Sequence, residues 1–190
     1  VLDNRNHSAL HYAGKYSSDT RVIDILLNYG CDINKQDDAG WIPIMVAARR
    51  GDAQVVKHML HRNADINIKE NNGATALHLS VVNSIEVLET LVQAAGADVN
   101  KQDVNDNTPI MYIAHDIQLD DDKNPVGEET EIEMMKLLLS HGAKTNVKNK
   151  QNQNIVDIAM MNNKQHIVHF LTSQDTGKEM LFVISQDKTT

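Results

Sequence analysis

The sequence predicts an all-α solenoid, in which helix–turn–helix units stack in a single row and are joined by short hairpin-like turns. The first observation is a repeated phrase: Asp-Ile-Asn at 32–34 recurs at 65–67, becomes Asp-Val-Asn at 98–100 and degenerates to Lys-Thr-Asn at 144–146. A second set of residues lies four positions before each phrase's asparagine: Gly30, Asn63, Gly96 and Gly142. The shared intervals of 33, 33 and 46 residues indicate a repeat architecture.

The first helix of each unit is predicted to begin at a capping residue that precedes small and apolar residues. Thr108 supplies a hydroxyl group before Pro109, whose missing N–H costs nothing at the first helical position. Related starts lie at Ser8, Ile42-Pro43, Thr75 and Asn154. The small side chains that follow, as at 46–48, let neighbouring helices approach closely.

The second helix of each unit carries apolar residues at helical spacing along one face. They are Val22, Ile25 and Leu26 in the first unit, Val55, Val56, Met59 and Leu60 in the second, and Met134, Leu137 and Leu138 in the fourth. Each second helix is predicted to end at the glycine or asparagine of the second set, because a residue with left-handed backbone commonly follows a helix.

Five units follow from this register, within one domain over residues 1–171: 3–36, 37–69, 70–102, 103–148 and 149–171. The fourth contains an acidic insertion, 117–129, with five carboxylates against one lysine, a net charge of −4. The insertion lacks the alternating oxygen ligands and central glycine of an EF-hand, so a solvated loop is predicted rather than a calcium site.

The tail, 172–190, is polar except for an apolar patch at 179–185. The end of a stack needs a polar outer face, so this patch is expected to dock on the last unit. The alternatives are a cap or part of a further element. Because the sequence starts at Val1 without a methionine, it is expected to be a fragment of a larger protein.

The composition restricts the function. Aromatic residues make up only 4% of the chain and hydrophobic residues 41%, so aliphatic and methionine side chains must fill a thin, repetitive core. A formal net charge of −8 argues against direct contact with nucleic acid or an anionic membrane; nucleic acid is expected only through a partner. The single cysteine, Cys31, excludes an internal disulfide and favours a cytoplasmic or nuclear location.

A 33-residue helix–turn–helix unit with a Thr-Pro-Leu-His-like start and a Gly-Ala-Asp-Val-Asn ending, as at 96–100, resembles the ankyrin repeat. The resemblance covers about residues 3 to 171 and implies an ankyrin-repeat solenoid. It also implies that His11 and His78 hydrogen-bond between adjacent turns. Three residues stand where the family prefers a turn glycine, so distorted turns are expected at Asn6, Asp106 and Asn152.

Catalysis has no support in the sequence. No Gly-rich phosphate loop, nucleophile elbow or zinc motif is present, so neither an enzyme nor a cofactor is predicted. His58 and His61 lie three residues apart, as do His166 and His169, but no third ligand follows a known metal pattern. Surface pairs are predicted instead of metal sites.

The resemblance places binding on the turn tips and on the exposed side of the first helices. The residues expected to contact a protein partner are Arg5, Tyr16, Asp38, Trp41, Arg49, Arg50, Asn72 and Asn83. Tryptophan, tyrosine and most of the exposed positive charge fall on the first two units, and these residue types dominate binding hot spots. The alternative for Arg49 and Arg50 is a solvated helix end.

Two functions remain open. The sequence resembles the intracellular ankyrin domain of a Notch-type receptor in four short segments, 15–17, 52–55, 81–83 and 157–159, the last followed by 166–168. This resemblance implies assembly of a transcriptional co-activator complex with a CSL-type DNA-binding factor and a Mastermind-type co-activator. The alternative is a soluble cytosolic ankyrin adaptor or inhibitor that binds and masks another client protein.

Overall fold

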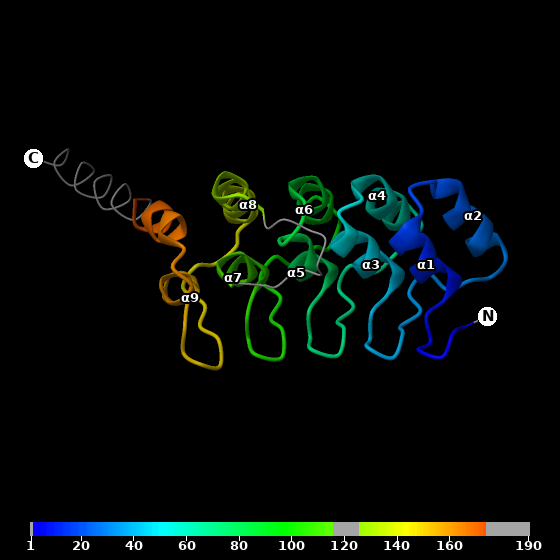
Figure 1. Cartoon of the computed structure of the whole chain (residues 1–190), viewed down its shortest axis with the longest axis horizontal. Helices are drawn as coiled ribbons and strands as arrows, with labels where there is room; N and C mark the ends of the chain where they lie inside the picture. The colour runs from blue at the N-terminus through cyan, green and yellow to red at the C-terminus, as the bar shows by residue number, and fades with distance from the viewer. Residues whose placement is uncertain (1, 116–125, 174–190) are drawn as a thin grey trace, which may run out of the picture.

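The structure of the chain, a computed structural model, describes residues 2–115 and 126–173. These residues form pairs of antiparallel helices stacked in one row (Figure 1), and no strand occurs among them beyond an isolated bridge between Leu2 and Ser8. The helices are α1 (Ala9–Tyr16), α2 (Thr20–Asn28), α3 (Pro43–Arg50), α4 (Ala53–His61), α5 (Ala76–Ser80), α6 (Ile85–Val92), α7 (Pro109–Ala114), α8 (Glu128–Ser140) and α9 (Ile155–Met161). Residues 165–173 are helical as well. The predicted all-α solenoid is confirmed.

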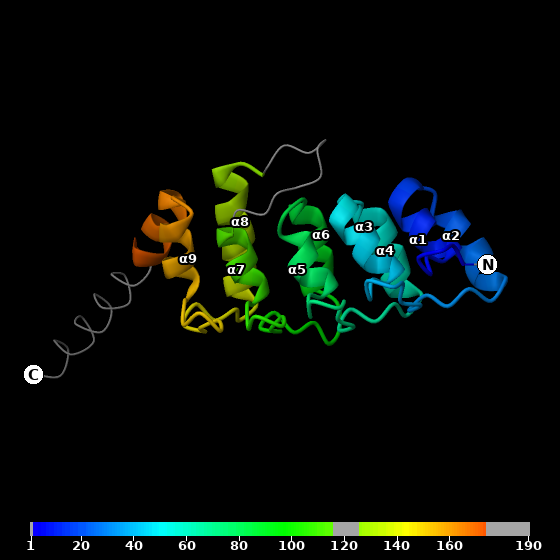
Figure 2. The same ribbon diagram turned by 60° about the horizontal axis from the view of Figure 1, so that its bottom comes forward.

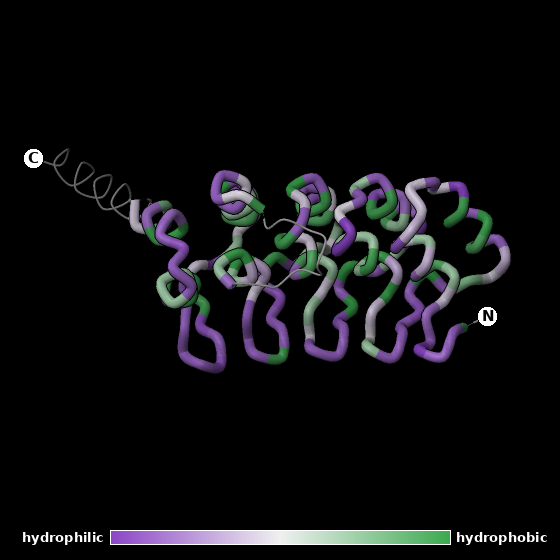
Figure 3. The backbone as a smooth tube through the Cα atoms, in the orientation of Figure 1, coloured by the Kyte–Doolittle hydropathy of each residue, from purple (hydrophilic) through white to green (hydrophobic). Residues whose placement is uncertain are grey.

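The helices form two rows with the connecting loops on one side. The first helices, α1, α3, α5, α7 and α9, each contact the next in their row, and the second helices α2, α4, α6 and α8 do the same. The loops between units project past the first helices and run along one edge of the stack (Figures 1 and 2). They are mostly hydrophilic (Figure 3), as expected for exposed turns.

Each first helix begins where the sequence predicts. The N-cap residues are Ser8, Ile42, Thr75, Thr108 and Asn154. The Nδ1 atom of His78 accepts the backbone N–H of Thr75 at 3.1 Å, and its Nε2–H donates to the Asn107 carbonyl oxygen of the following unit at 3.2 Å. His11 bonds in the same way to the Trp41 carbonyl oxygen at 2.9 Å. The predicted contact of these imidazoles with the adjacent turn is confirmed.

The second helices also end where the sequence predicts. Gly30, Asn63, Gly96 and Gly142 have left-handed backbone, with φ of 80°, 63°, 82° and 86°. The asparagines of the first three phrases reach the same place in the next unit. The Asn67 side-chain amide donates to the Gly96 carbonyl oxygen at 3.1 Å, and that of Asn100 donates to the Gly142 carbonyl oxygen at 2.9 Å. The two sequence markers are therefore partners across the first three boundaries.

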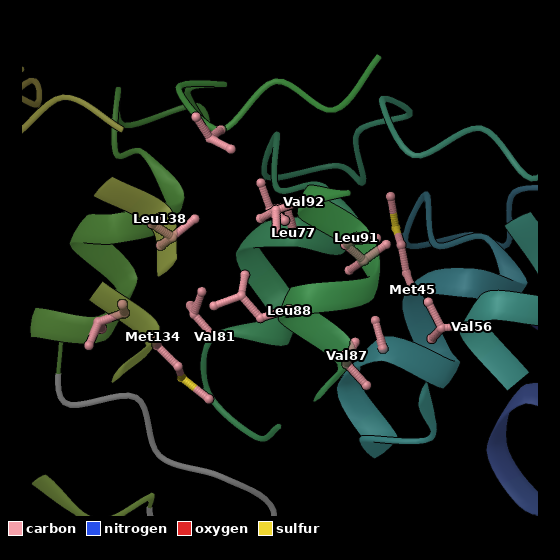
Figure 4. Packing of buried hydrophobic residues seen from close by; sticks show 14 of the residues in the cluster. Met45, Val56, Leu77, Val81, Val87, Leu88, Leu91, Val92, Met134 and Leu138 are labelled. Carbon is pink, nitrogen blue, oxygen red and sulfur yellow. The ribbon is translucent and has the colours of Figure 1, made fainter. Parts of the chain in front are cut away.

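The core is a continuous aliphatic layer between the two rows. Leu88 and Leu91 of α6 are at most 1% exposed and lie near Val56 of α4 on one side and Leu138 of α8 on the other (Figure 4). Each unit thus completes the core of its neighbours. Close approach is essential between α1 and α3, because a Cβ atom on Gly14 would lie 2.8 Å from the Pro43 carbonyl oxygen.

The expectation of distorted turns is wrong. Asn6, Asp106 and Asn152 have φ of 61°, 63° and 60°, the left-handed conformation that Gly40 and Gly73 adopt in the other units. Asparagine and aspartate tolerate this conformation better than other residues with a side chain. The substitution therefore keeps the turn.

The limits of the insertion and of the last unit also need correction. Helix α8 begins at Glu128, so the last two residues of the predicted insertion, 117–129, form the first turn of a helix rather than a loop. Residues 116–125 lie outside the described residues. The second helix of the last unit continues to 173, beyond the predicted limit of 171, and the apolar patch at 179–185 lies outside the described residues.

We expect Gly96→Val to lower the free energy of unfolding by about 1 kcal/mol or more, because β-branched residues are strained at positive φ. A Cβ atom there would meet only Asn67 Nδ2, at 3.9 Å, so the penalty is one of backbone rather than space. Chemical denaturation measures the loss. Gly96→Asn is the matched control, because Asn63 holds the equivalent position, and it should cost clearly less. Equal stability of the valine variant and the parent would contradict this assignment.

Candidate binding surface

The predicted tip residues lie on a row of loops joined by backbone hydrogen bonds. Arg5, Asp38 and Asn72 are exposed there. The Asp38 N–H donates to the Arg5 carbonyl oxygen at 3.1 Å, and the Val104 N–H donates to the Asn72 carbonyl oxygen at 2.9 Å. Equivalent bonds join Asn71 to Ala39 and Lys150 to Asn105. All five tips are therefore held in a fixed order along one edge.

In each tip, an acidic or amide side chain accepts hydrogen bonds from the backbone N–H groups of the same loop. One carboxylate oxygen of Asp103 accepts the N–H groups of Asn105 and Asn107, both at 2.8 Å. The Tyr112 hydroxyl donates to the other oxygen at 2.9 Å, and burial next to this carboxylate raises the pKa of Tyr112. Sequence reasoning missed these residues as supports of the tips, although the same spacing recurs at Asp3 and Asp37.

Aromatic and cationic side chains gather on the first two units. Tyr16 is 68% exposed; its ring stacks on that of Tyr12 with 6.2 Å between centroids, and the Lys15 ammonium group lies 5.2 Å from its centroid. In the second unit the Arg49 guanidinium group lies 5.5 Å from the centroid of the Trp41 ring. We call these five residues the aromatic surface.

The two halves of the aromatic surface are connected through His7. Its ring meets Tyr12 edge-on with 5.8 Å between centroids, and its Nε2 lies 3.3 Å from a carboxylate oxygen of Asp37. The other carboxylate oxygen of Asp37 accepts the Trp41 N–H at 2.8 Å. Tyr12 was missed in the sequence. Tyr12 lies four residues before Tyr16, about one helical turn away, and this spacing could have indicated that the two rings are neighbours.

Further predicted binding residues also have contacts within the stack. Arg50 donates to the Ser17 carbonyl oxygen at 3.0 Å and to Ser18 Oγ at 2.7 Å, so it holds the second unit to the connection between α1 and α2. The Asn83 side-chain amide donates to the Arg49 carbonyl oxygen. Trp41 is only partly exposed and packs against the core, so the stack already covers part of its ring.

The histidines are engaged in structural contacts. His78 is buried, and burial lowers its pKa to about 4, so the imidazole is neutral at physiological pH. Burial also lowers the pKa of His11. His58 Nε2 lies 2.7 Å from an Asp24 carboxylate oxygen, and His166 Nε2 lies 2.6 Å from one of Glu131. Over residues 2–115 and 126–173, no group of three His, Cys, Asp or Glu side chains is placed to hold a metal ion.

Comparison with known proteins agrees with this architecture. Residues 10–103 match a family model described as ankyrin repeats in three copies. The chain contains ankyrin repeats. Ankyrin-repeat domains are protein–protein interaction modules and are generally not catalytic. Within the part of the chain that the structure describes, no helix is long and apolar enough to cross a membrane.

Curated relatives share the repeats over different lengths. The putative ankyrin repeat protein FPV031 of fowlpox virus is 29% identical over 159 residues, which cover 80% of this chain and 43% of that protein. The putative ankyrin repeat protein L371 of Acanthamoeba polyphaga mimivirus is 26% identical over 153 residues, 77% of this chain and 18% of that protein. The phosphate system positive regulatory protein PHO81 of Saccharomyces cerevisiae is 37% identical over 65 residues, 34% of this chain and 6% of that protein. The chain spans less than half the length of each.

We expect the buried ankyrin-repeat histidine, His78, to make stability rise with pH between about 4 and about 6.5. In this window the unfolded chain protonates the imidazole, whose ordinary pKa is 6.5, while the folded chain keeps it neutral. The contribution is fully present above pH 6.5, is lost as the pH falls toward 4, and amounts to about 3 kcal/mol.

Chemical denaturation at several pH values measures this slope. His78→Asn should flatten it, whatever the variant costs in stability at neutral pH. His61→Asn is the control, because it removes an exposed histidine of α4 without opening a buried contact. A His78→Asn variant with the parent's slope would contradict the assignment.

Proposed function

We propose that this chain binds a protein partner through the aromatic surface and the neighbouring tips of its first two ankyrin repeats. The observation that carries the proposal is the connected row of contacts from Tyr16 through Tyr12, His7 and Asp37 to Trp41. It gives exposed aromatic area that is already ordered before any partner arrives. Ordering of this kind reduces the entropy lost on binding.

The residue types support a binding role. Tyrosine, tryptophan and arginine are the side chains most enriched among binding hot spots. Tyr16 and Tyr12 are 68% and 46% exposed and stack on each other in a chain with few aromatics. The tips beside them, at Arg5 and Asp38, add polar groups at the rim, where an interface takes its hydrogen bonds.

Two partner assignments refine this proposal. The first is assembly with a CSL-type DNA-binding factor and a Mastermind-type co-activator helix, supported by the short segments that resemble a Notch-type receptor. Its first segment, 15–17, contains Tyr16, and three residues, 17–19, connect α1 to α2, whereas only two, 51–52, connect α3 to α4. The second assignment is an adaptor or inhibitor that masks a different client.

We expect Tyr16→Ala to weaken binding of the native partner by about 2 kcal/mol or more, roughly thirtyfold in affinity, with little change in melting temperature. Tyr16 is mostly exposed, so its removal takes little from the core. The control is Tyr29→Ala, because Tyr29 is 86% exposed but lies just after α2, in the other row of helices. Partners captured by the parent from a cell lysate are identified, purified and titrated with both variants. Equal affinity of parent and Tyr16→Ala would move the site elsewhere on the stack.

Trp41→Ala is expected to behave differently from Tyr16→Ala. Because Trp41 packs against the core, its truncation should lower both the affinity and the melting temperature. Titration of a purified CSL-type factor on DNA, with and without the Mastermind-type helix, decides between the assignments. The receptor-type assignment requires a ternary complex that Tyr16→Ala weakens; the adaptor assignment requires no complex with these proteins.

A further inference from the structure

The last ankyrin repeat presents an apolar face that the described residues leave uncovered. Met160 of α9 is the sixth residue after its N-cap, Asn154. The sixth residues after the N-caps of the three preceding repeats, Ala48, Val81 and Ala114, are at most 1% exposed, whereas Met160 is 53% exposed.

This position faces the following repeat throughout the stack. In the first repeat it is Gly14, where an added Cβ atom would meet the Pro43 carbonyl oxygen at 2.8 Å and the Ala47 nitrogen of α3 at 3.5 Å. The equivalent residues are therefore buried because the next repeat packs on them. Met160 thus occupies a position that is buried in the other repeats, but no following repeat packs on it among the described residues.

Neighbouring side chains extend the uncovered face. Met161, next to Met160, is 68% exposed. In the helix at 165–173, Val168 is partly exposed, whereas Val56, at the equivalent position of α4, is 0% exposed. Large exposed hydrophobic side chains are costly when grouped, and the end of a repeat stack ordinarily needs a polar outer face.

The sequence after this helix contains one apolar run, Met180–Ile184. It does not continue the repeat pattern. The next position in register, 33 residues after Gly142, is residue 175, so the run lies five to nine residues later. The earlier repeats have their mostly polar turns in that interval, at 35–39, 68–72 and 101–105. The run is thus apolar where a further repeat would be polar.

We propose that Met180–Ile184 folds back on the face formed by Met160, Met161 and Val168 and caps the stack. Six residues, 174–179, separate the run from the helix, a reach of about 20 Å when extended. Packed helices lie about 8–10 Å apart, so this reach suffices to return to α9. The proposal does not depend on the identity of the partner bound at the aromatic surface.

The test compares two double variants of the 190-residue chain that add the same charge. Leu181→Asp with Phe182→Asp places carboxylates in the run, whereas Thr189→Asp with Thr190→Asp places them in a polar stretch. Hydrogen exchange of backbone amides is read over 155–171. The first variant should exchange about tenfold faster there and melt about 4 °C lower; the second should match the parent. Equal exchange in all three chains would overturn the proposal.

A second variant checks the other side of the contact. Met160→Ala should speed exchange over 155–171 in the parent, and it should add little in the Leu181→Asp, Phe182→Asp background, because the contact is already lost. Additive effects would overturn the proposal, since they would show that Met160 and the run act independently. The remaining alternative is that a second copy of the chain covers this face, and size-exclusion chromatography at several concentrations tests it. Protection from hydrogen exchange that appears only in a dimer would assign the face to a second copy and overturn the intramolecular cap.

Discussion

The stack depends on one side-chain amide that is repeated at the first three boundaries between units. Asn67 donates to the carbonyl oxygen of Gly96, and Asn34 accepts the N–H of Asp65 at 2.9 Å. Asn100 makes both bonds, to the carbonyl oxygen of Gly142 and from the N–H of Lys144. An amide offers a donor and an acceptor on one short side chain, so it satisfies two backbone groups left unpaired where a helix ends. The regular spacing of the sequence markers follows from this bond, because each asparagine must meet the next helix end.

The tips add a second row of bonds on the other side of the first helices. Because the Asn72 carbonyl oxygen accepts the Val104 N–H and the Arg5 carbonyl oxygen accepts the Asp38 N–H, neighbouring units are fixed relative to each other at two separated points. Two such points resist both sliding and rotation. The aromatic surface is therefore presented by a scaffold whose geometry is set by these two rows of bonds and not by the aromatic side chains.

The sequence was sufficient for the features that are decided locally. Helix starts at Thr75 and Pro109 and helix ends at Gly96 depend on capping chemistry within a few residues, and the structure has them there. Features that depend on contacts between units could not be predicted from the sequence. The exposure of Trp41 depends on packing against the core, and the role of Arg50 depends on Ser17 and Ser18 of the preceding unit.

The insertion shows the same limit. Periodicity predicts an insertion from the excess over 33 residues, but not that α8 begins at Glu128 and carries contacts to the last unit. Glu131, 7% exposed, is paired with Lys164 at 2.7 Å and with His166 at 2.6 Å. A carboxylate in such a place is stable only with partners, and these lie more than 30 residues away.

The side-chain links between units differ from one boundary to the next. Histidine bridges the first unit to the second and the third to the fourth, whereas Met45 and Met111 occupy the equivalent positions of the second and fourth units. A methionine has no N–H group to donate to the carbonyl oxygen of the next turn, and its sulfur is only a weak hydrogen-bond acceptor. Accordingly Thr108 Oγ1 is buried without a hydrogen-bond partner among the described residues.

An unpaired buried hydroxyl costs stability, and the second and fourth units lack an imidazole bridge to the unit that follows. Other bonds hold these boundaries: the Asn71 N–H donates to the Ala39 carbonyl oxygen at 3.0 Å between the second and third units, and Lys164 pairs with Glu131 at 2.7 Å between the fourth and fifth. The aromatic surface lies within a bridged pair, where His11 holds the carbonyl group of Trp41 itself. The residues best suited to contact a partner thus stand on a boundary that has this imidazole bridge in addition to the bond between the tips.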